Sequence, residues 1–242
     1  MNKRCPTAVK RRDASSDSGA IRSSRCSGRN ARISTSIGVG PWAIVSLRCA
    51  TPMGHSGAGR TTRRFRKIDG LLRFHAAYED DAPRITFPDG RVIRGGDPNI
   101  HAALSEALGQ PVTLSREATI SHLDAGPLHL LTTASLAWLR SILPDAHIDD
   151  RRFRPNMLID LPGSTQKERL WLGKTLCVGE VILRVRDLTE RCVMVNLKQA
   201  DLPDDSRMLR GLGHDAIPQF GVYAEVLVPG TIKRNDRVLE AS

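Results

Sequence analysis

The feature that most constrains the fold is a succession of short apolar segments after residue 64, separated by glycine, proline and aspartate. Most are too short for a typical helix and are rich in Val, Ile and Leu, which is typical of β-strands. Many short strands joined by turns favour a β-barrel core with helices packed outside. We therefore predict an α+β, mainly β fold, with strands at 71–78, 84–87, 91–93, 111–114, 127–131, 157–161, 176–178, 181–185, 192–196, 221–227 and 238–240.

Three helices are predicted among these strands from capping residues, which satisfy the free backbone groups at helix ends, and from prolines. The first follows Asp97-Pro98 and ends at Gly109, the second covers 134–143 after Thr132-Thr133, and the third covers 204–212.

The positive charge of the chain is concentrated at its N-terminal end. Residues 1–67 contain 15 Lys and Arg against two acidic residues, so the remaining residues carry 21 − 24 = −3. The basic excess therefore does not indicate that the folded part binds nucleic acid specifically. Because residues 1–64 show almost no apolar periodicity, we expect this leader to be largely disordered.

The chain has no run of about 18 apolar residues, so we expect no membrane span. Its five cysteines show no CxxC or Cys/His spacing of the zinc type. An odd cysteine count without a secretory leader favours a reducing compartment, in which a free thiol can act as a ligand or nucleophile. We therefore expect a cytoplasmic protein.

Positive charge also gathers just before the strand predicted at 157–161, where Arg151, Arg152, Arg154 and Asn156 follow one another closely. Arginine forks bind phosphate in bidentate geometry, and the asparagine amide is a further donor. The alternative, which composition alone favours, is a solvated loop whose arginines pair with neighbouring aspartates.

Cys192 directly follows Arg191, and a neighbouring cation favours the thiolate form that binds metals or carries a persulfide. The alternative is a small buried core residue. Thr133 and Ser135 lie at the start of the second predicted helix, where hydroxyls and backbone N–H groups either bind an anion or simply cap the helix.

His122, Asp124 and His129 are residue types that bind metals, but their spacing matches no recognised ligand pattern, and a polar turn is the favoured interpretation.

Several of these segments resemble a MOSC domain, named after the C-terminal domain of molybdenum cofactor sulfurases. The similar segments are Arg-Phe-Arg-Pro-Asn at 152–156, Arg-Cys at 191–192, Phe-Gly-Val-Tyr-Ala-Glu-Val at 220–226 and Leu-Leu-Thr-Thr-Ala-Ser-Leu at 130–136. The resemblance implies a leader at 1–64, a partial N-terminal β-barrel domain at 65–116 and the MOSC domain at 117–242.

The resemblance also implies a function. It makes Cys192 the catalytic residue and the ligand of molybdenum in a molybdenum-pterin cofactor. The implied activity is oxo transfer, in which a small N-hydroxylated substrate loses oxygen and an external ferredoxin- or flavin-type reductase supplies electrons. The implied cofactor-binding residues are Arg152, Arg154, Asn156, Thr133, Ser135 and Arg191.

Two other functions remain open. In the first, Cys192 carries a persulfide taken from a cysteine desulfurase, and pyridoxal phosphate is bound by that partner alone. In the second, the chain is a degenerate, inactive family member, because the Tyr-Pro-Val-Lys-Ser and Gly-Asp-Arg motifs typical of the N-terminal half-domain do not occur in residues 1–65.

Overall fold

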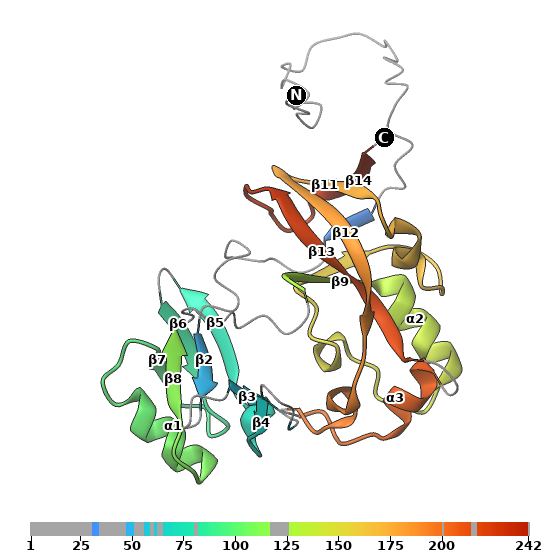
Figure 1. Ribbon diagram of the computed structural model, residues 1–242. Coiled ribbons are helices and arrows are strands. Elements are labelled where there is room, and N and C mark those ends of the chain that lie inside the picture. The colour runs from blue at the N-terminus through green and yellow to red at the C-terminus, as the bar shows by residue number, and fades with distance from the viewer. Residues whose placement is uncertain are drawn as a thin grey trace, which may run out of the picture.

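The computed structural model describes residues 31–33, 47–50, 56–58, 61, 65–79, 82–116, 126–199, 201–213 and 217–241. Strands predominate over helices, and the sheets comprise one closed barrel and two smaller sheets (Figure 1). The predicted fold class, mainly β with a barrel core and peripheral helices, is confirmed. No helix in the described part of the chain is long and apolar enough to cross a membrane.

The barrel is built from strands that follow the order β1-β10-β9-β13-β12-β11-β14, with β1 and β14 pairing to close it. All its neighbours are antiparallel except β9 and β10, which are parallel. The chain crosses between these two through a helix, as a parallel pair requires. The elements are β1 (Ala31–Ile33), β9 (Leu128–Thr132), α2 (Thr133–Ile142), β10 (Met157–Asp160), β11 (Thr175–Val178), β12 (Val181–Glu190), β13 (Gln219–Val228) and β14 (Arg237–Ala241).

The apolar pattern of each strand explains which faces it buries. In the first half of β12, Val181, Leu183 and Val185 are at most 1% exposed while the arginines between and after them face solvent. This period of two places one face of an antiparallel strand in the core. In contrast, all of β9 is buried. Leu130 lies in the barrel core and Leu131 packs under the helical layer, so β9 is covered on both faces.

The helical layer packs beside the barrel around Phe153 and Phe220, whose rings lie 4.6 Å apart. The predicted N-cap of α2 is confirmed, because the Thr132 hydroxyl accepts a hydrogen bond from the Ser135 N–H. The other elements are η2 (Asp150–Arg152), η4 (Val193–Asn196) and α3 (Arg207–Leu212).

The strand predicted at 192–196 is wrong, because η4 is a 3-10 helix there. Val193 is 47% exposed and Val195 is 1% exposed, whereas residues two apart in a strand would face the same side. Asn196 accepts hydrogen bonds from the N–H groups of Asp205 and Leu209, at 2.8 and 2.9 Å. These contacts with the α3 segment replace the partners that a sheet would supply.

The N-terminal part forms two smaller sheets, ordered β4-β3-β2-β8 and β5-β6-β7. A separate core joins them to α1, which ends at Gly109 in a left-handed conformation, as predicted. The elements are β2 (Leu47–Ala50), β3 (Ser56–Ala58), β4 (Phe65–Lys67), η1 (Leu71–Arg73), β5 (His75–Glu79), β6 (Ala82–Thr86), β7 (Val92–Arg94), α1 (Ile100–Leu108) and β8 (Thr113–Arg116).

Two expectations differ from this arrangement. The strand predicted at 71–78 is divided into η1 and β5. In addition, β1, β2 and β3 lie within the 1–64 leader for which we expected disorder, and β1 pairs with β10 and β14. Apart from these strands and Thr61, the leader lies outside the described residues. The division into three domains stays a prediction.

A buried carboxylate attaches η3 (Lys167–Trp171) to the N-terminus of α2. Glu168 is fully buried, and its carboxylate accepts hydrogen bonds from the Ser135 hydroxyl at 2.6 Å and the Thr132 hydroxyl at 2.7 Å. Burial raises the pKa of Glu168, and the two hydroxyls oppose this effect. Glu168 therefore binds its proton more tightly in the folded protein than in the unfolded chain.

We expect Glu168 to make stability depend on pH. Its stabilising contribution is fully present below the unfolded-chain pKa of 4.5 and is lost as pH rises through the raised folded-state pKa. The free energy of unfolding of Glu168→Gln, minus that of the wild type, should therefore increase as pH rises above 4.5. The difference should become constant above the folded-state pKa of Glu168. Urea unfolding at several pH values measures this, with Glu106→Gln on α1 as an exposed control. Parallel pH profiles for wild type and Glu168→Gln would contradict the assignment.

Candidate functional site

The candidate site lies where β12 leaves the barrel. The Arg191 N–H donates to the Pro218 carbonyl at 2.7 Å, which keeps this end of β12 beside β13. Cys192 follows in extended conformation as the N-cap of η4, and its side chain is a partly buried, free thiol. The thiol therefore lies at the change from sheet to helix, next to the exposed side chain of Val193.

The arginine loop before β10 contacts this end of β12. Arg191 Nη2 donates to the Phe153 carbonyl at 2.7 Å, and the Arg191 guanidinium lies 5.7 Å from the centre of the Phe153 ring. Arg154 has a left-handed backbone with φ of 53°, which is uncommon for a residue other than glycine. The residue as a whole is exposed, whereas burial of its guanidinium lowers the pKa of that group. Arg191 therefore joins the Cys192 segment to the loop that carries Arg154.

The two guanidinium groups influence each other. Burial lowers the pKa of Arg191 to about 10; Tyr223 and Cys192 oppose this effect, and the charge of Arg154 reinforces it. At neutral pH Arg191 is still protonated, and its guanidinium interacts with the charges of both Arg154 and Cys192. Such a pair of arginines attracts an oxyanion.

Asn156 connects the loop to β9. Its side-chain Oδ1 accepts from the His129 N–H at 2.7 Å, and its own N–H donates to the His129 carbonyl at 2.8 Å. These bonds extend the β9–β10 pairing toward the arginine loop. The amide oxygen is thus used by the scaffold, while within the described residues the amide NH2 group makes no hydrogen bond and remains available as a donor.

His129 is a buried residue of β9, as the strand predicted at 127–131 implied, and not part of the polar turn suggested for the His122, Asp124 and His129 group. Its Nε2 lies 3.3 Å from the Phe220 carbonyl. Burial, reinforced by the charge of Arg191, lowers the pKa of His129 to about 3, so the imidazole is neutral at physiological pH. At Gly221 a Cβ would collide with His129 Nε2, and φ is +87°, so glycine is required there. His122 and Asp124 lie outside the described residues.

Two buried polar atoms near Cys192 have no hydrogen-bond partner within the described residues. They are Arg191 Nε and Thr189 Oγ1, two positions apart at the end of β12. Buried polar groups are normally paired, so an acceptor for Arg191 Nε is the partner that the site lacks. Nothing in the sequence distinguishes Thr189 from other strand threonines, and its burial is the signal that identifies it.

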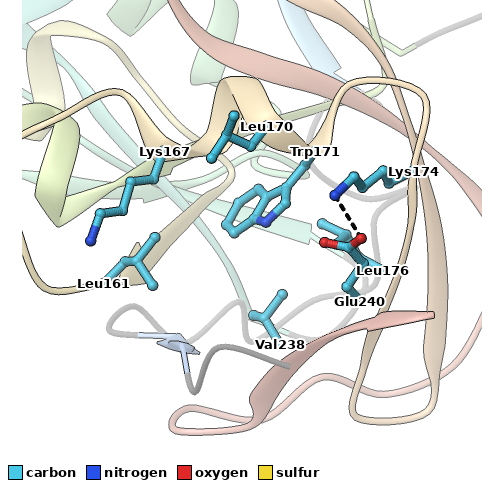
Figure 2. Close-up of a pocket in the computed structure, with 8 residues that line it drawn as sticks. All are labelled: Leu161, Lys167, Leu170, Trp171, Lys174, Leu176, Val238 and Glu240. Carbon is cyan, nitrogen blue, oxygen red and sulfur yellow. Dashed lines mark ion pairs between the residues drawn. The ribbon is translucent and has the colours of Figure 1, made fainter. Parts of the chain in front are cut away.

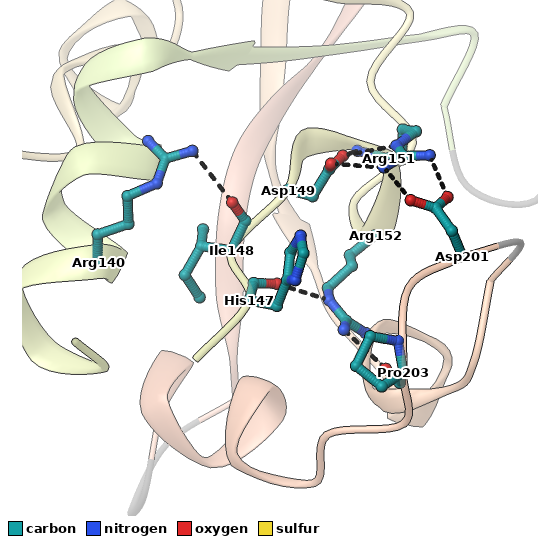
Figure 3. Close-up of polar contacts among 8 residues, drawn as sticks. All are labelled: Arg140, His147, Ile148, Asp149, Arg151, Arg152, Asp201 and Pro203. Carbon is teal, nitrogen blue, oxygen red and sulfur yellow. Dashed lines mark hydrogen bonds and ion pairs between the residues drawn. The ribbon is translucent and has the colours of Figure 1, made fainter. Parts of the chain in front are cut away.

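Arg152, in contrast, belongs to the scaffold. It is 1% exposed, and its guanidinium donates to the carbonyls of His147 at 3.0 Å and Pro203 at 2.7 Å (Figure 3). It also donates to the Val195 carbonyl at 3.5 Å. Carbonyl oxygens from three segments thus surround it, and it holds the loop against η4. These contacts make Arg152 part of the scaffold, and its direct contact with a cofactor stays a prediction.

Arg151 points to the surface. It pairs with Asp149 at 2.8 Å and with Asp201 at 2.7 Å (Figure 3). The alternative that composition favoured, an exposed arginine paired with neighbouring aspartates, therefore holds for Arg151 alone. Neighbouring arginines of one motif have three environments: a surface ion pair, a buried scaffold and, at Arg154, an exposed residue with a buried guanidinium beside the site.

Thr133 and Ser135 lie past the C-terminal end of β9, whereas His129 is near its start. The Ser135 hydroxyl donates to Glu168, and the Thr133 hydroxyl donates to Asp160 at 3.0 Å and accepts from the Leu161 N–H at 2.9 Å. No hydrogen bond in the described part of the chain joins either hydroxyl to the Cys192 cluster. Of the predicted site residues, the structure brings together Arg154, Asn156, Arg191 and Cys192.

This arrangement can bind an oxyanion beside a thiol. The described residues contain no group of three His, Cys, Asp or Glu side chains placed to hold a metal ion. The Cys192 thiol can supply one soft ligand to a metal ion. The same thiol can also act as a nucleophile.

The scaffold role of Arg152 predicts a large loss of stability on substitution. Arg152→Met leaves buried carbonyl groups without donors, and we expect the free energy of unfolding to fall by about 2–4 kcal/mol. The matched surface change Arg151→Met should cost less than about 1 kcal/mol. Urea unfolding measures both variants. Equal effects would show that Arg152 does not hold the loop.

Comparison with known proteins identifies the domain. The family model described as MOSC domain matches residues 90–239. Similar solved structures include YiiM from Escherichia coli, with 16% identity over 48% of this chain and a TM-score of 0.37, and YuaD from Bacillus subtilis, with 14% identity over 53% and a TM-score of 0.41. The alignments span 55% of the YiiM chain and 70% of the YuaD chain. No curated protein matches the chain.

Proposed function

Because the chain belongs to the MOSC domain family, as the match over residues 90–239 establishes, we propose that it binds a molybdenum-pterin cofactor beside Cys192 and catalyses oxo transfer. The observation that carries this proposal is the free thiol of Cys192 next to the buried Arg191 Nε, for which the described residues provide no acceptor. The MOSC family is generally associated with this cofactor.

The residues of the site fit such a group in two respects. A pterin phosphate would accept hydrogen bonds from Arg191 and Arg154. Thr189, two positions before Arg191, and Asn156, two positions after Arg154, carry further donors. A thiolate at Cys192 is a soft ligand, which suits a thiol-binding transition metal. In the proposal, Arg152, Thr133 and Ser135 contribute through the scaffold.

When bound, the cofactor supplies a metal that can accept oxygen from an N-hydroxylated compound. The chain's own residues would orient it: the Phe153 carbonyl fixes the direction of Arg191, and neutral His129 adds no competing charge. The exposed apolar side chains of Val193 and Ile217 flank the Arg191–Pro218 hydrogen bond and would form the edge that a substrate passes. An external ferredoxin- or flavin-type reductase would supply electrons.

We expect molybdenum to depend on the cysteine. Protein from a host that makes the cofactor should contain molybdenum near stoichiometry, and Cys192→Ser should reduce it about tenfold or more, because the variant loses the soft ligand. Elemental mass spectrometry of the purified proteins measures this. Wild-type protein without molybdenum, or equal contents in both proteins, would contradict the proposal.

We also expect the pterin to depend on Arg191. Arg191→Gln should lower the bound pterin about tenfold or more, because it removes a charged donor to the phosphate. Arg186→Gln, which changes an exposed arginine of the same strand, should retain wild-type pterin content. Fluorescence of the oxidised pterin released from each protein measures this independently of the metal. Matching losses in both variants would argue against a phosphate contact at Arg191.

A second candidate function is that of a persulfide carrier. One observation favours it: the Cys192 thiol is partly exposed beside the exposed Val193, which suits sulfur transfer to or from a partner protein. Incubation with a pyridoxal-phosphate-dependent cysteine desulfurase and cysteine would then place sulfane sulfur on Cys192. Sulfane sulfur without molybdenum would select this function, and neither would indicate an inactive member.

A further inference from the structure

The N-terminal sheet of β5, β6 and β7 leaves one side of β5 without a partner strand in the described part of the chain. The register of its pairing with β6, on the other side, sets Ala77 opposite Arg84. The barrel differs, because β14 pairs with both β1 and β11 and closes it. There Lys174, directly before β11, also forms an ion pair with Glu240 of β14 (Figure 2). β5 therefore presents an edge to which a further strand can add.

Alternate residues of β6 direct their backbone groups to opposite sides of the sheet. The Phe87 N–H donates to the Arg91 carbonyl at 2.8 Å, and the Pro83 carbonyl accepts from the Gly95 N–H at 2.7 Å. Odd-numbered positions of β6 therefore face β7, and even-numbered positions face β5.

The same alternation shows which backbone groups of β5 lie at its open side. His75, Ala77 and Glu79 are opposite the even-numbered positions of β6, so they direct their N–H and C=O groups inward. Ala76 and Tyr78 direct theirs away from β6. His75, Ala76 and Ala77 are exposed, and both alanines are small enough to let another backbone approach.

The sequence of β5 lacks the residues that normally protect an edge strand. Natural edge strands are blocked by charged side chains, especially lysine, and by proline. β5, with the sequence His-Ala-Ala-Tyr-Glu, contains no lysine, arginine or proline. The other described edge strands of the two N-terminal sheets carry such charges: Arg66 and Lys67 on β4, Arg94 on β7 and Arg116 on β8. Two copies would repel each other at those edges, but not at β5.

We propose that β5 pairs antiparallel with β5 of a second copy of this chain, in a register centred on Ala77. This register sets His75 opposite Glu79 of the second copy, and the reverse pair follows by symmetry. Ala76 and Tyr78 of each copy then exchange N–H and C=O groups with Tyr78 and Ala76 of the other, so the groups at the open side find partners. The 3-stranded sheets of the two copies become one continuous sheet.

Charge favours a second copy that runs in the antiparallel direction. The chain carries Arg73 and His75 before and at the start of β5, and Glu79, Asp80 and Asp81 at and after its end. Antiparallel pairing brings the basic end of one copy beside the acidic end of the other, whereas parallel pairing would bring like charges together. The pairing uses no residue of the cofactor site proposed above, so the two proposals succeed or fail separately.

The first test measures the oligomeric state of the full chain by sedimentation equilibrium over a range of concentrations. We expect a reversible monomer–dimer equilibrium, since a short edge is a small interface. Ala76→Pro removes an N–H that points to the open side, and it should raise the dimer dissociation constant about tenfold or more.

The matched control is Val92→Pro on β7. Val92 lies opposite Thr86, an even-numbered position of β6, so its N–H also points away from the sheet. This variant should dimerise as the wild type does. A monomeric wild type, a dimer that Ala76→Pro leaves intact, or equal weakening by both prolines would overturn the proposal.

The second test examines the register without a proline, by the same measurement. Glu79→Lys places a lysine opposite the histidine of the second copy and should weaken the dimer about threefold to tenfold. The double variant His75→Glu/Glu79→Lys reverses both charges and should restore the wild-type affinity. Glu106→Lys, which makes the same change at an exposed position of α1, is the control and should dimerise normally. Equal affinity in Glu79→Lys and wild type, or a double variant no stronger than Glu79→Lys, would refute the antiparallel register.

Discussion

The pairing of β12 with β13 is the constraint on which the rest of the structure depends. The first half of β12 buries Val181, Leu183 and Val185 in the barrel. Register shifts interrupt its pairing with β13 between Val185 and Glu190. Bulges of this kind bend a strand and redirect side chains. The strand therefore leaves the core where Cys192 begins η4, and the same pairing that stabilises the barrel also positions the thiol.

The arginines of the site differ in the groups that surround them. Backbone carbonyls accept hydrogen bonds from the Arg152 guanidinium, so this arginine stabilises the scaffold. Arg191 uses one carbonyl and one aromatic face, and its Nε lacks a partner in the described structure. Arg154 has a left-handed backbone, and burial lowers the pKa of its guanidinium. The loop thus keeps its shape through one arginine, while two others leave positive charge beside the thiol, the combination on which oxyanion binding depends.

Local patterns predicted the elements whose own residues determine them. The short apolar run at 181–185 identified the first half of β12, and a side-chain cap identified the start of α2, because both depend on neighbours in sequence. The prediction at 192–196 failed because Asn196 contacts a segment about ten residues away, which no local pattern records. Likewise, the Arg-Phe-Arg-Pro-Asn motif marked the right loop but could not separate Arg152 from Arg154, since their difference arises from tertiary packing. Thr189 and His129 acquire their roles through burial alone.

We propose that the cationic thiol site at the end of β12 holds a molybdenum-pterin cofactor. An anomalous difference map at the molybdenum edge, from crystals of protein made in a cofactor-producing host, tests this proposal most directly. We expect a peak within bonding distance of Cys192 Sγ, with pterin phosphate density against Arg191. A map without that peak, or with molybdenum bound elsewhere, would contradict it.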